Sequence, residues 1–489
     1  MQNALLRWSG IAGIIAFCLL QPGLAYFKPP LARRAVLSYN SSQHLSSSRL
    51  PPFKCPMSNV KCEGSMRKII IRKPTPINPF NEPARALRIL NKPLWQWQQD
   101  LLAPYVEDQL IVDDPRAAPR DPVETIVHSE NLWFDEAYFD AFLKEARSRH
   151  RPVRAAFQTD DPCFLQHGLR NLSKSYAPRA DLYYVDLWYF PSGLSDQAEA
   201  VVVPSDAAVV PFRHPPIVTP GQPQRTQSEW YLPQRAVCAI DSWVHVLFAN
   251  IIFGVYAQAN RAGASGGGLQ AALLSIVERK PTYSTSALVQ VGKDCHIDPT
   301  AVIQGPCLIG DNVTIGPGVF VSRSIIGSNV VLAGSNHFDL CVLSDDCFFP
   351  FGASAAMTTY MEGSSAGHGT SMELSVVGRN SVIGSGTVFT DFNVLPVPLK
   401  AMGDTHLTEV GLPMLGACIG HNCRIGSGLV FFPGRAVESD VALVASATRR
   451  VIAKHITYEE SDHHFIGDGN LHPRRYPRIE EFPEPEPQR

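Results

Sequence analysis

Residues 303–327 read IQGPCLIGDNVTIGPGVFVSRSIIG, and this stretch decides the fold of the C-terminal part of the chain. An aliphatic or aromatic residue recurs at every sixth position, often with glycine after it. The series comprises Ile297, Ile303, Ile309, Ile315 and Val321; Val377, Ile383 and Phe389; and Ile419, Ile425, Phe431 and Val437. This period is the hexapeptide repeat of a parallel β-helix. Three short strands form one triangular coil, and each coil is stable only against its neighbours.

The repeat extends from about residue 287 to residue 447, and residues 448–489 form a C-terminal tail. Its register breaks at residues 335–376 and again at 393–416. We interpret both breaks as loop insertions that project from the coils, because insertions in solenoids often build the binding face.

Glycine is distributed unevenly along the 489 residues. Of the 35 glycines, 21 lie between Gly292 and Gly434, where small residues let a β-helix turn its corners. None lies between Gly64 and Gly168. A glycine-rich phosphate loop is therefore excluded from residues 65–167.

Residues 66–235 show alternating strand and helix patterns, which predict an α/β domain. Strands are expected at 68–72, 109–112, 181–189 and 200–204, and helices at 92–103 and 134–149. Residues 236–286 follow as a connecting helix and linker. The helix, 236–261, is strongly apolar, but its polar residues favour packing on both domains over a membrane span.

Residues 1–65 have the composition of a targeting segment. The first 62 residues contain seven Lys or Arg and no Asp or Glu. An apolar run from Ile11 to Leu20 is typical of a secretory signal, and the Ser-rich stretch after Ala25 resembles a plastid transit peptide. Together they predict a bipartite presequence for a plastid. The alternative is that Met66 is the true start, which makes 1–65 a non-native extension of a cytoplasmic protein.

Residues 91–102 read NKPLWQWQQDLL. They resemble the segment after the nucleotide loop in sugar-1-phosphate nucleotidyltransferases that carry a C-terminal left-handed β-helix. The resemblance implies an N-terminal α/β nucleotidyltransferase-like domain followed by a left-handed parallel β-helix, with sugar phosphate and nucleotide as partners and Mg²⁺ as cofactor. On matching positions, Arg85 and Lys92 would contact phosphate and Glu130 would hold the metal.

The nucleotide loop itself departs from that family. The family has a Gly-x-Gly-Thr-Arg loop whose backbone N–H groups cradle the triphosphate. This chain instead has TPINPFN at residues 75–81, in which two prolines also remove N–H donors. Conventional nucleotidyl transfer is therefore in doubt, although the fold is not.

Residues 362–387 read EGSSAGHGTSMELSVVGRNSVIGSGT. They resemble the acetyltransferase half of the bifunctional uridylyltransferase/glucosamine-1-phosphate acetyltransferase. The match makes His368 the general base, a role that suits a neutral imidazole. It implies acetyl-CoA bound along the coils between subunits, Asp391 and Asn393 at the substrate segment, and a homo-oligomer, expected to be a trimer.

Three functions remain open at this point. The chain is a nucleotidyltransferase-like enzyme with a divergent site, a β-helix acyltransferase that uses His368, or a non-catalytic protein that binds a sugar phosphate or nucleotide-sugar. The net charge of −2 gives no basic field for nucleic acid, so no nucleic-acid partner is expected.

Overall fold

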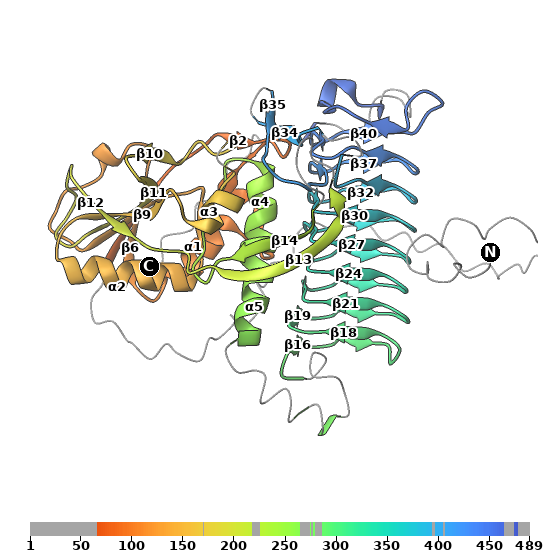
Figure 1. The fold of residues 1–489 in the computed structure, drawn as a ribbon, viewed down its shortest axis with the longest axis horizontal. Helices are drawn as coiled ribbons and strands as arrows, with labels where there is room; N and C mark the ends of the chain where they lie inside the picture. The colour runs from red at the N-terminus through yellow and green to blue at the C-terminus, as the bar shows by residue number, and fades with distance from the viewer. Residues whose placement is uncertain are drawn as a thin grey trace, which may run out of the picture. The chain divides into compact units, whose positions relative to one another are not determined.

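The structure is a computed structural model, and it describes residues 66–169, 171–217, 225–264, 274, 277–278, 286–393, 397–403, 406–463 and 474–477. The presequence expected at 1–65 lies outside the described residues. The α/β domain precedes the β-helix along the chain (Figure 1).

The N-terminal domain is built on a seven-stranded mixed sheet. The strand order is β12-β9-β11-β7-β1-β6, with β10 paired to β11. Strand β1 is parallel to both β6 and β7, whereas β11 is antiparallel to β7 and β9. The strands are β1 (Met66–Ile71), β6 (Val106–Val112), β7 (Thr125–Ser129), β9 (Val153–Gln158), β10 (Ala177–Arg179), β11 (Leu182–Phe190) and β12 (Glu199–Val202).

Helix α2 (Glu136–Arg149) shows how local sequence sets the elements around this sheet. The Asp135 carboxylate caps it by accepting the Tyr138 N–H at 2.8 Å. Its buried face, which includes Phe139 and Phe142, packs on the sheet core. The other helices of this domain are α1 (Leu94–Leu102), α3 (Pro162–His167) and the 3₁₀ turns η1 (Ala84–Ala86) and η2 (Pro115–Ala117), whereas the 3₁₀ turn η5 (Tyr458–Glu460) follows the last strand of the β-helix.

Four short two-stranded pairs complete the domain. They are β2 (Pro76–Ile77) with β3 (Glu82–Pro83), β4 (Arg88–Ile89) with β5 (Lys92–Pro93), β8 (Leu132–Phe134) with β15 (Val237–Ala239), and β13 (Ala208–Ile217) with β14 (Arg225–Leu232).

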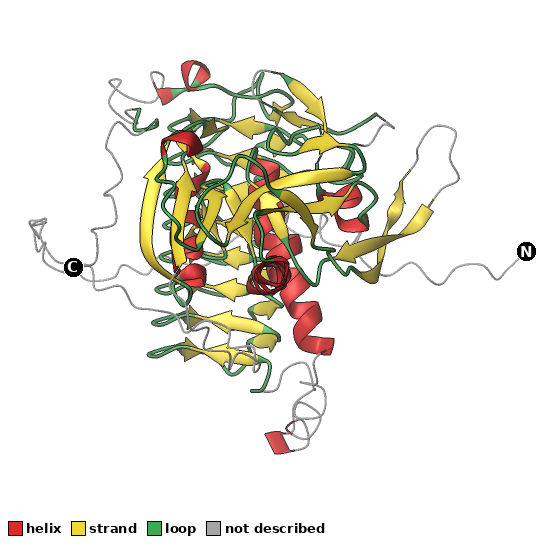
Figure 2. Ribbon diagram, turned by 90° about the vertical axis from the view of Figure 1, so that its left-hand side faces the viewer, coloured by secondary structure: helices red, strands yellow, loops and turns green. Residues whose placement is uncertain are grey.

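A helix connects the two folds. It comprises α4 (Trp243–Asn250), the π-helical segment η3 (Ile251–Tyr256) and α5 (Ala257–Ala264), and it runs beside the coils in both views (Figure 1, Figure 2). Its side chains, including Trp243 and Phe248, share one core with residues of the N-terminal domain and of the β-helix. Among the described residues, no helix combines the length and apolar character needed to cross a bilayer.

The C-terminal domain is a left-handed parallel β-helix, as the hexapeptide pattern and the family resemblance predict. Each of its three sheets has eight parallel strands. The first sheet contains β16 (Val289–Val291), β19 (Cys307–Ile309), β22 (Ile325–Ile326), β25 (Val342–Leu343), β28 (Thr359–Tyr360), β31 (Val376–Val377), β36 (Cys418–Ile419) and β39 (Ala436–Val437). The second contains β17 (His296–Ile297), β20 (Thr314–Ile315), β23 (Val331–Leu332), β26 (Phe348–Phe349), β29 (Ser365–Ala366), β32 (Val382–Ile383), β37 (Arg424–Ile425) and β40 (Ala442–Leu443). The third contains β18 (Val302–Gln304), β21 (Phe320–Ser322), β24 (His337–Asp339), β27 (Ser354–Ala356), β30 (Ser371–Glu373), β33 (Val388–Phe389), β38 (Val430–Phe431) and β41 (Val451–Ile452).

The loop insertion expected at residues 335–376 is wrong, because regular coils occupy this stretch. Phe338 pairs with Ala355, and Leu343 with Tyr360, so each coil here is 17 residues long. One corner has lost a residue, and only five positions separate the inward Phe338 from the inward Leu343. The missing residue shifts the period of six out of phase without interrupting the coils.

The shortened corner also explains an unusual backbone feature. Leu340, Met357 and Leu374 occupy equivalent corner positions with φ of 53°, 47° and 48°, in the left-handed region. All three side chains are buried in the core shared with the N-terminal domain. Packing between the domains thus compensates for the strained backbone.

The second expected insertion, at 393–416, is confirmed. The antiparallel pair β34 (Lys400–Met402) and β35 (Leu407–Glu409) lies between β33 and β36 in the chain and belongs to none of the three large sheets. At the end of the β-helix, β41 pairs with β38 beyond the boundary expected at residue 447.

Candidate functional site

Arg85 and Glu130 face each other in a small cleft of the N-terminal domain. Arg85 lies in η1 and Glu130 follows β7 directly, and 3.7 Å separates Nη1 from Oε2. The cleft has about 380 Å³ of empty space, part of it open to solvent. Its lining consists of Lys68, Ile70, Arg85, Trp95, Gln98, Gln99, Gln109, Ile111 and Glu130.

The Glu130 carboxylate is buried and already engaged. Its Oε1 accepts the Lys73 backbone N–H at 2.7 Å, and its Oε2 faces Arg85. Burial raises its pKa above the ordinary range despite these partners. Among the described residues, no group of three or more His, Cys, Asp or Glu side chains is arranged to hold a metal. The Glu130 Oε2 has no hydrogen-bond partner among the described residues, and the Arg85 guanidinium lies 3.7 Å from it. One carboxylate oxygen beside cations is too few ligands for Mg²⁺, which requires an octahedral set of oxygens, so these residues do not fit the ion.

Lys68 is a cleft residue that the sequence did not single out. It lies in β1, it is 3% exposed, and burial lowers the pKa of its ammonium group to about 8. Among the described residues it forms no ion pair. The signal in the sequence is a lysine inside an expected buried strand, KIIIR at 68–72.

Lys92, expected to contact phosphate beside Arg85, is not among the residues that line the cleft. Its Nζ forms an ion pair with Asp100 at 2.6 Å. The structure therefore brings Arg85 and Glu130 together and places Lys92 apart from them.

The segment that replaces the nucleotide loop is attached to the β-helix. The Asn81 side chain donates to the Glu438 carboxylate at 2.7 Å, and the Ser439 N–H donates to the Pro79 carbonyl at 3.0 Å. Phe80 is fully buried and lies 4.9 Å, ring to ring, from His421. Within the loop, the Phe80 and Asn81 N–H groups donate to the Ile77 carbonyl at 2.9 and 3.0 Å, and the two prolines carry no N–H, so these positions offer no donor to a phosphate.

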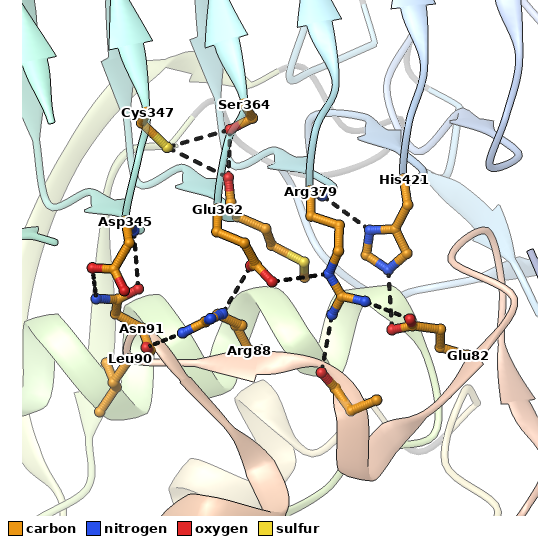
Figure 3. Close-up of polar contacts among 12 residues, drawn as sticks. Glu82, Arg88, Leu90, Asn91, Asp345, Cys347, Glu362, Ser364, Arg379 and His421 are labelled. Atoms are coloured by element: carbon orange, nitrogen blue, oxygen red, sulfur yellow. Dashed lines mark hydrogen bonds and ion pairs between the residues drawn. The ribbon is translucent and has the colours of Figure 1, made fainter. Parts of the chain in front are cut away.

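A buried polar network continues this attachment (Figure 3). Arg379 of the β-helix pairs with Glu82, donates to the Ala86 carbonyl at 3.0 Å, and meets Glu362 at 3.0 Å. Glu362 also pairs with Arg88 at 2.8 Å. Burial opposes its charge, but the two guanidinium groups outweigh burial and hold the pKa of Glu362 below its ordinary value.

The same network contains a buried histidine and an asparagine clamp. His421 accepts the Arg379 N–H through Nδ1 at 2.9 Å, and burial lowers its pKa. The Asn91 side chain exchanges two hydrogen bonds with Asp345, at 2.9 and 3.2 Å. These contacts join strands β3 to β5 to the coils, so we interpret the network as structural.

His368 stands exposed at a corner of the β-helix. Its Nδ1 lies 3.4 Å from the Ser385 Oγ, and its ring meets that of Phe351 edge-on at 4.6 Å. Gly369 and Gly386 follow in the same corner column, where an added Cβ would meet nothing within 4 Å. His368 is thus exposed to solvent, and the glycine positions beside it leave room at this corner. Neither described neighbour carries a charge for the phosphates of a coenzyme.

Asp391 and Asn393 lie beyond β33, and no described contact joins them to His368. The Asn393 side chain donates to the Val397 carbonyl at 2.8 Å. Burial raises the pKa of Asp391. The neighbouring Glu373 is affected more strongly, since burial together with the charges of Asp391 and Asp339 raises its pKa to about 7.

In a comparison with known protein families, the family model that matches lies in the hexapeptide part of the chain. The family model for the bacterial transferase hexapeptide, six repeats, matches residues 289–323. The bifunctional protein GlmU of Heliobacterium modesticaldum is 28% identical over 180 residues, which are 34% of this chain and 39% of that protein. GlmU of Acinetobacter baumannii strain ACICU is 27% identical over 176 residues, 32% of this chain and 39% of the relative. The chain thus spans about two fifths of these relatives.

Two solved acetyltransferase structures are also similar. A putative acetyltransferase of Bacillus cereus matches with a TM-score of 0.15 and 12% identity over 29% of this chain and 76% of the other. The polysialic acid O-acetyltransferase OatWY matches with a TM-score of 0.16 and 15% identity over 34% and 77%. Scores this low carry no argument about function. The family match and the observed coils together show that the C-terminal part of the chain is a hexapeptide-repeat β-helix, and the chain is similar to GlmU proteins over about a third of its length.

Proposed function

We propose that the N-terminal cleft binds a sugar 1-phosphate or a nucleotide-sugar and that the domain does not carry out conventional nucleotidyl transfer. The observation that carries this proposal is the pair of cations, Lys68 and Arg85, at a cleft with one engaged carboxylate. Phosphate oxygens suit such groups, and arginine can hold two of them at once. The similarity to GlmU proteins supports a sugar-related ligand.

The loss of nucleotidyl transfer is inferred from residues 75–81, the segment that is attached to the β-helix. Nucleotidyl transfer requires donors that stabilise charge on a reacting phosphate. Residues 75–81 contain two prolines, and the backbone there accepts hydrogen bonds from Ser439. A bound phosphate would therefore meet the two side-chain cations but no backbone cradle.

Calorimetric titration of a hexose 1-phosphate and of a UDP-sugar tests binding, and pyrophosphate release in the presence of UTP tests turnover. We expect binding without release. Arg85→Ala and Lys68→Met should each weaken binding roughly tenfold, the scale of one charged hydrogen bond. Lys92→Ala is the matched control, since Lys92 pairs with Asp100 and should leave affinity unchanged. Steady pyrophosphate release, or equal losses in all three variants, would overturn the proposal.

The β-helix supports a second candidate, acyl transfer from acetyl-CoA with His368 as base. The supporting observation is that this histidine is exposed, at a corner where the neighbouring glycine positions leave room. In that reaction the acceptor amine or hydroxyl attacks the thioester carbonyl, His368 takes its proton, and the CoA thiolate leaves. His368→Ala should abolish thiol release from acetyl-CoA, whereas His337→Ala, an exposed histidine of β24, should not.

The proposed acyltransferase is a homo-trimer, because hexapeptide β-helix proteins commonly assemble in threes and the coenzyme would lie between subunits. Light scattering of the purified chain measures this directly. A monomer with full acyltransferase activity would contradict the shared-site arrangement.

A further inference from the structure

A second cavity lies beside α3, and it shares no lining residue with the Arg85–Glu130 cleft. It has about 460 Å³ of empty space, part of it open to solvent. The cavity lies at the carboxyl ends of the parallel strands β9 and β12, the edge where open α/β sheets bind ligands. Its lining consists of Tyr138, Phe157, Asp161, Cys163, Phe164, His167, Gly168, Tyr176, Val203, Ser205, Pro233, Arg235, Ala236, Val237, Cys238 and Phe253.

Aromatic rings form much of the wall. Phe157 and Phe164 lie 4.4 Å apart, centroid to centroid, and Tyr176 meets them edge-on at 5.3 and 5.5 Å. Rings prefer offset or edge-to-face partners at such distances. The wall therefore favours a flat, apolar ligand.

His167 presents an unused acceptor among the residues that line the cavity. Its ring is 1% exposed, and its Nε2 lies 3.1 Å from the Tyr231 carbonyl oxygen. A carbonyl only accepts, so Nε2 carries the proton and Nδ1 holds a lone pair. Among the described residues, this buried Nδ1 has no hydrogen-bond partner. Burial lowers the pKa of His167 to about 3, which keeps the ring neutral.

Tyr138 supplies an unused donor. Its side chain is 1% exposed, and its Oη has no hydrogen-bond partner among the described residues. Burial raises its pKa, so the hydroxyl keeps its proton. An orphaned buried polar group costs about 1–3 kcal/mol, and two on one cavity call for an explanation.

The charged residues of the cavity are already engaged. The Arg235 guanidinium pairs with Asp206 at 2.9 Å. The Asp161 carboxylate accepts from the Phe164 and Ser205 N–H groups, each at 3.1 Å, and from the Ser205 hydroxyl at 2.9 Å. No unpaired cation therefore remains on this lining for a phosphate, and the ligand must be neutral.

We propose that this cavity binds a small, neutral, planar molecule that accepts one hydrogen bond and donates another. An aromatic amide has this chemistry: its carbonyl accepts from Tyr138 Oη, its N–H donates to His167 Nδ1, and its ring packs among Phe157, Phe164 and Tyr176. The site is independent of phosphate binding in the Arg85–Glu130 cleft.

Benzamide, toluene, benzoate and inorganic phosphate are the probes, titrated into the full chain and followed by thermal shift and calorimetry. We expect benzamide to bind most tightly, toluene more weakly for lack of hydrogen bonds, and the two anions not at all. Tyr138→Phe should weaken benzamide roughly fivefold, the effect of one hydrogen bond, and leave toluene unchanged. The variant should fold, since it removes only an unpartnered hydroxyl.

Tyr189→Phe is the matched control. Tyr189 is also a buried tyrosine of the sheet domain, but its hydroxyl bonds Glu124 at 2.8 Å and does not line the cavity. This variant should lower the unfolding temperature and leave benzamide affinity intact. Absence of benzamide binding, preference for phosphate, or equal affinity in wild type and Tyr138→Phe would overturn the proposal. So would a high-resolution structure in which only ordered water satisfies both groups in the presence of benzamide.

Discussion

The guanidinium of Arg379, on the β-helix, forms a buried ion pair with the carboxylate of Glu82, in the N-terminal segment. The Arg379 side chain is 6% exposed and that of Glu82 is 1% exposed. The two residues are far apart in the sequence, yet their contact fixes the segment that stands where the resembling family keeps its nucleotide loop. The pair thus links the architecture of the chain to the loss of a phosphate cradle.

Replacing Arg379 with Met should lower the free energy of unfolding by about 3–5 kcal/mol, because it leaves the Glu82 charge buried without its partner. Urea denaturation measures the loss. Arg120→Met is the control, since Arg120 pairs with Asp196 in the open, with 53% and 78% of their side chains exposed. That variant should lose less than about 1 kcal/mol. Equal losses of unfolding free energy in the two variants would contradict a stabilising role of the buried Arg379–Glu82 pair.

Glu373 predicts a pH dependence of stability. Its pKa is about 7 in the folded chain and near 4.3 when unfolded, so the folded state binds more protons between these values. Stability contributed by the protonated form is present at low pH and falls as pH rises through 7. Glu373→Gln should remove this fall, by at most about 1.4 kcal/mol per pH unit. Denaturation midpoints at pH 5, 6 and 8 test it, and parallel profiles of variant and wild type would disprove it.

For Lys68 we expect the opposite pH dependence: in alkaline solution, the stability of the folded chain should rise with pH. The folded lysine loses its proton near pH 8 and the unfolded one near 10.4, so the unfolded chain binds more protons in this interval. Stability should therefore rise between pH 8 and 10 in the wild type, and Lys68→Met should lack this rise. Lys144→Met, an exposed lysine of α2, is the control and should follow the wild type. If the stability of the wild type did not change between pH 8 and 10, the prediction that burial lowers the pKa of Lys68 would be wrong.

Ser375 forms side-chain hydrogen bonds that join two coils at a corner of the β-helix, and these bonds should contribute to the stability of the chain. Its Oγ donates to the Glu373 carbonyl at 2.9 Å and accepts the Ala417 N–H at 3.1 Å, which joins two coils. Ser375→Ala should cost about 1–3 kcal/mol, because it leaves buried backbone groups unpaired. Ser354→Ala, at an exposed position of β27, should change stability by less than 0.5 kcal/mol or so, as surface substitutions usually do. Chemical denaturation of both variants decides the point.

Much of the fold could be predicted from local pattern. Period-six residues such as Ile309 and Ile315 specify inward positions, because each short strand buries one side chain. The apolar run 236–261 predicts a helix between the domains; its start, Val237–Ala239, is instead the strand β15, and the helix that begins at Trp243 shares its core with both domains. A constant period of six does not reveal the coils at 335–376, because a coil that is one corner residue shorter changes the phase of the pattern without interrupting the coils.

The residues of the Arg85–Glu130 cleft could be predicted from the sequence only in part. Arg85 and Glu130 were both expected and do face each other. Lys92 was expected beside them, but its position in the chain does not reveal that Asp100 lies within reach. The expected buried strand at 68–72 indicates that Lys68 is buried, but it does not reveal the cleft at which its ammonium group lies.

The sequence by itself determined the repeating coils, the α/β character of the first domain and the absence of a glycine-rich phosphate loop, because each depends on residue types at short, regular spacing. Only the tertiary structure decided that residues 75–93 attach to the β-helix, that Arg379 meets Glu82, and that Tyr138 and His167 line one cavity. These relationships join residues from distant parts of the chain, and their energies come from burial and charge pairing that exist only in the folded chain.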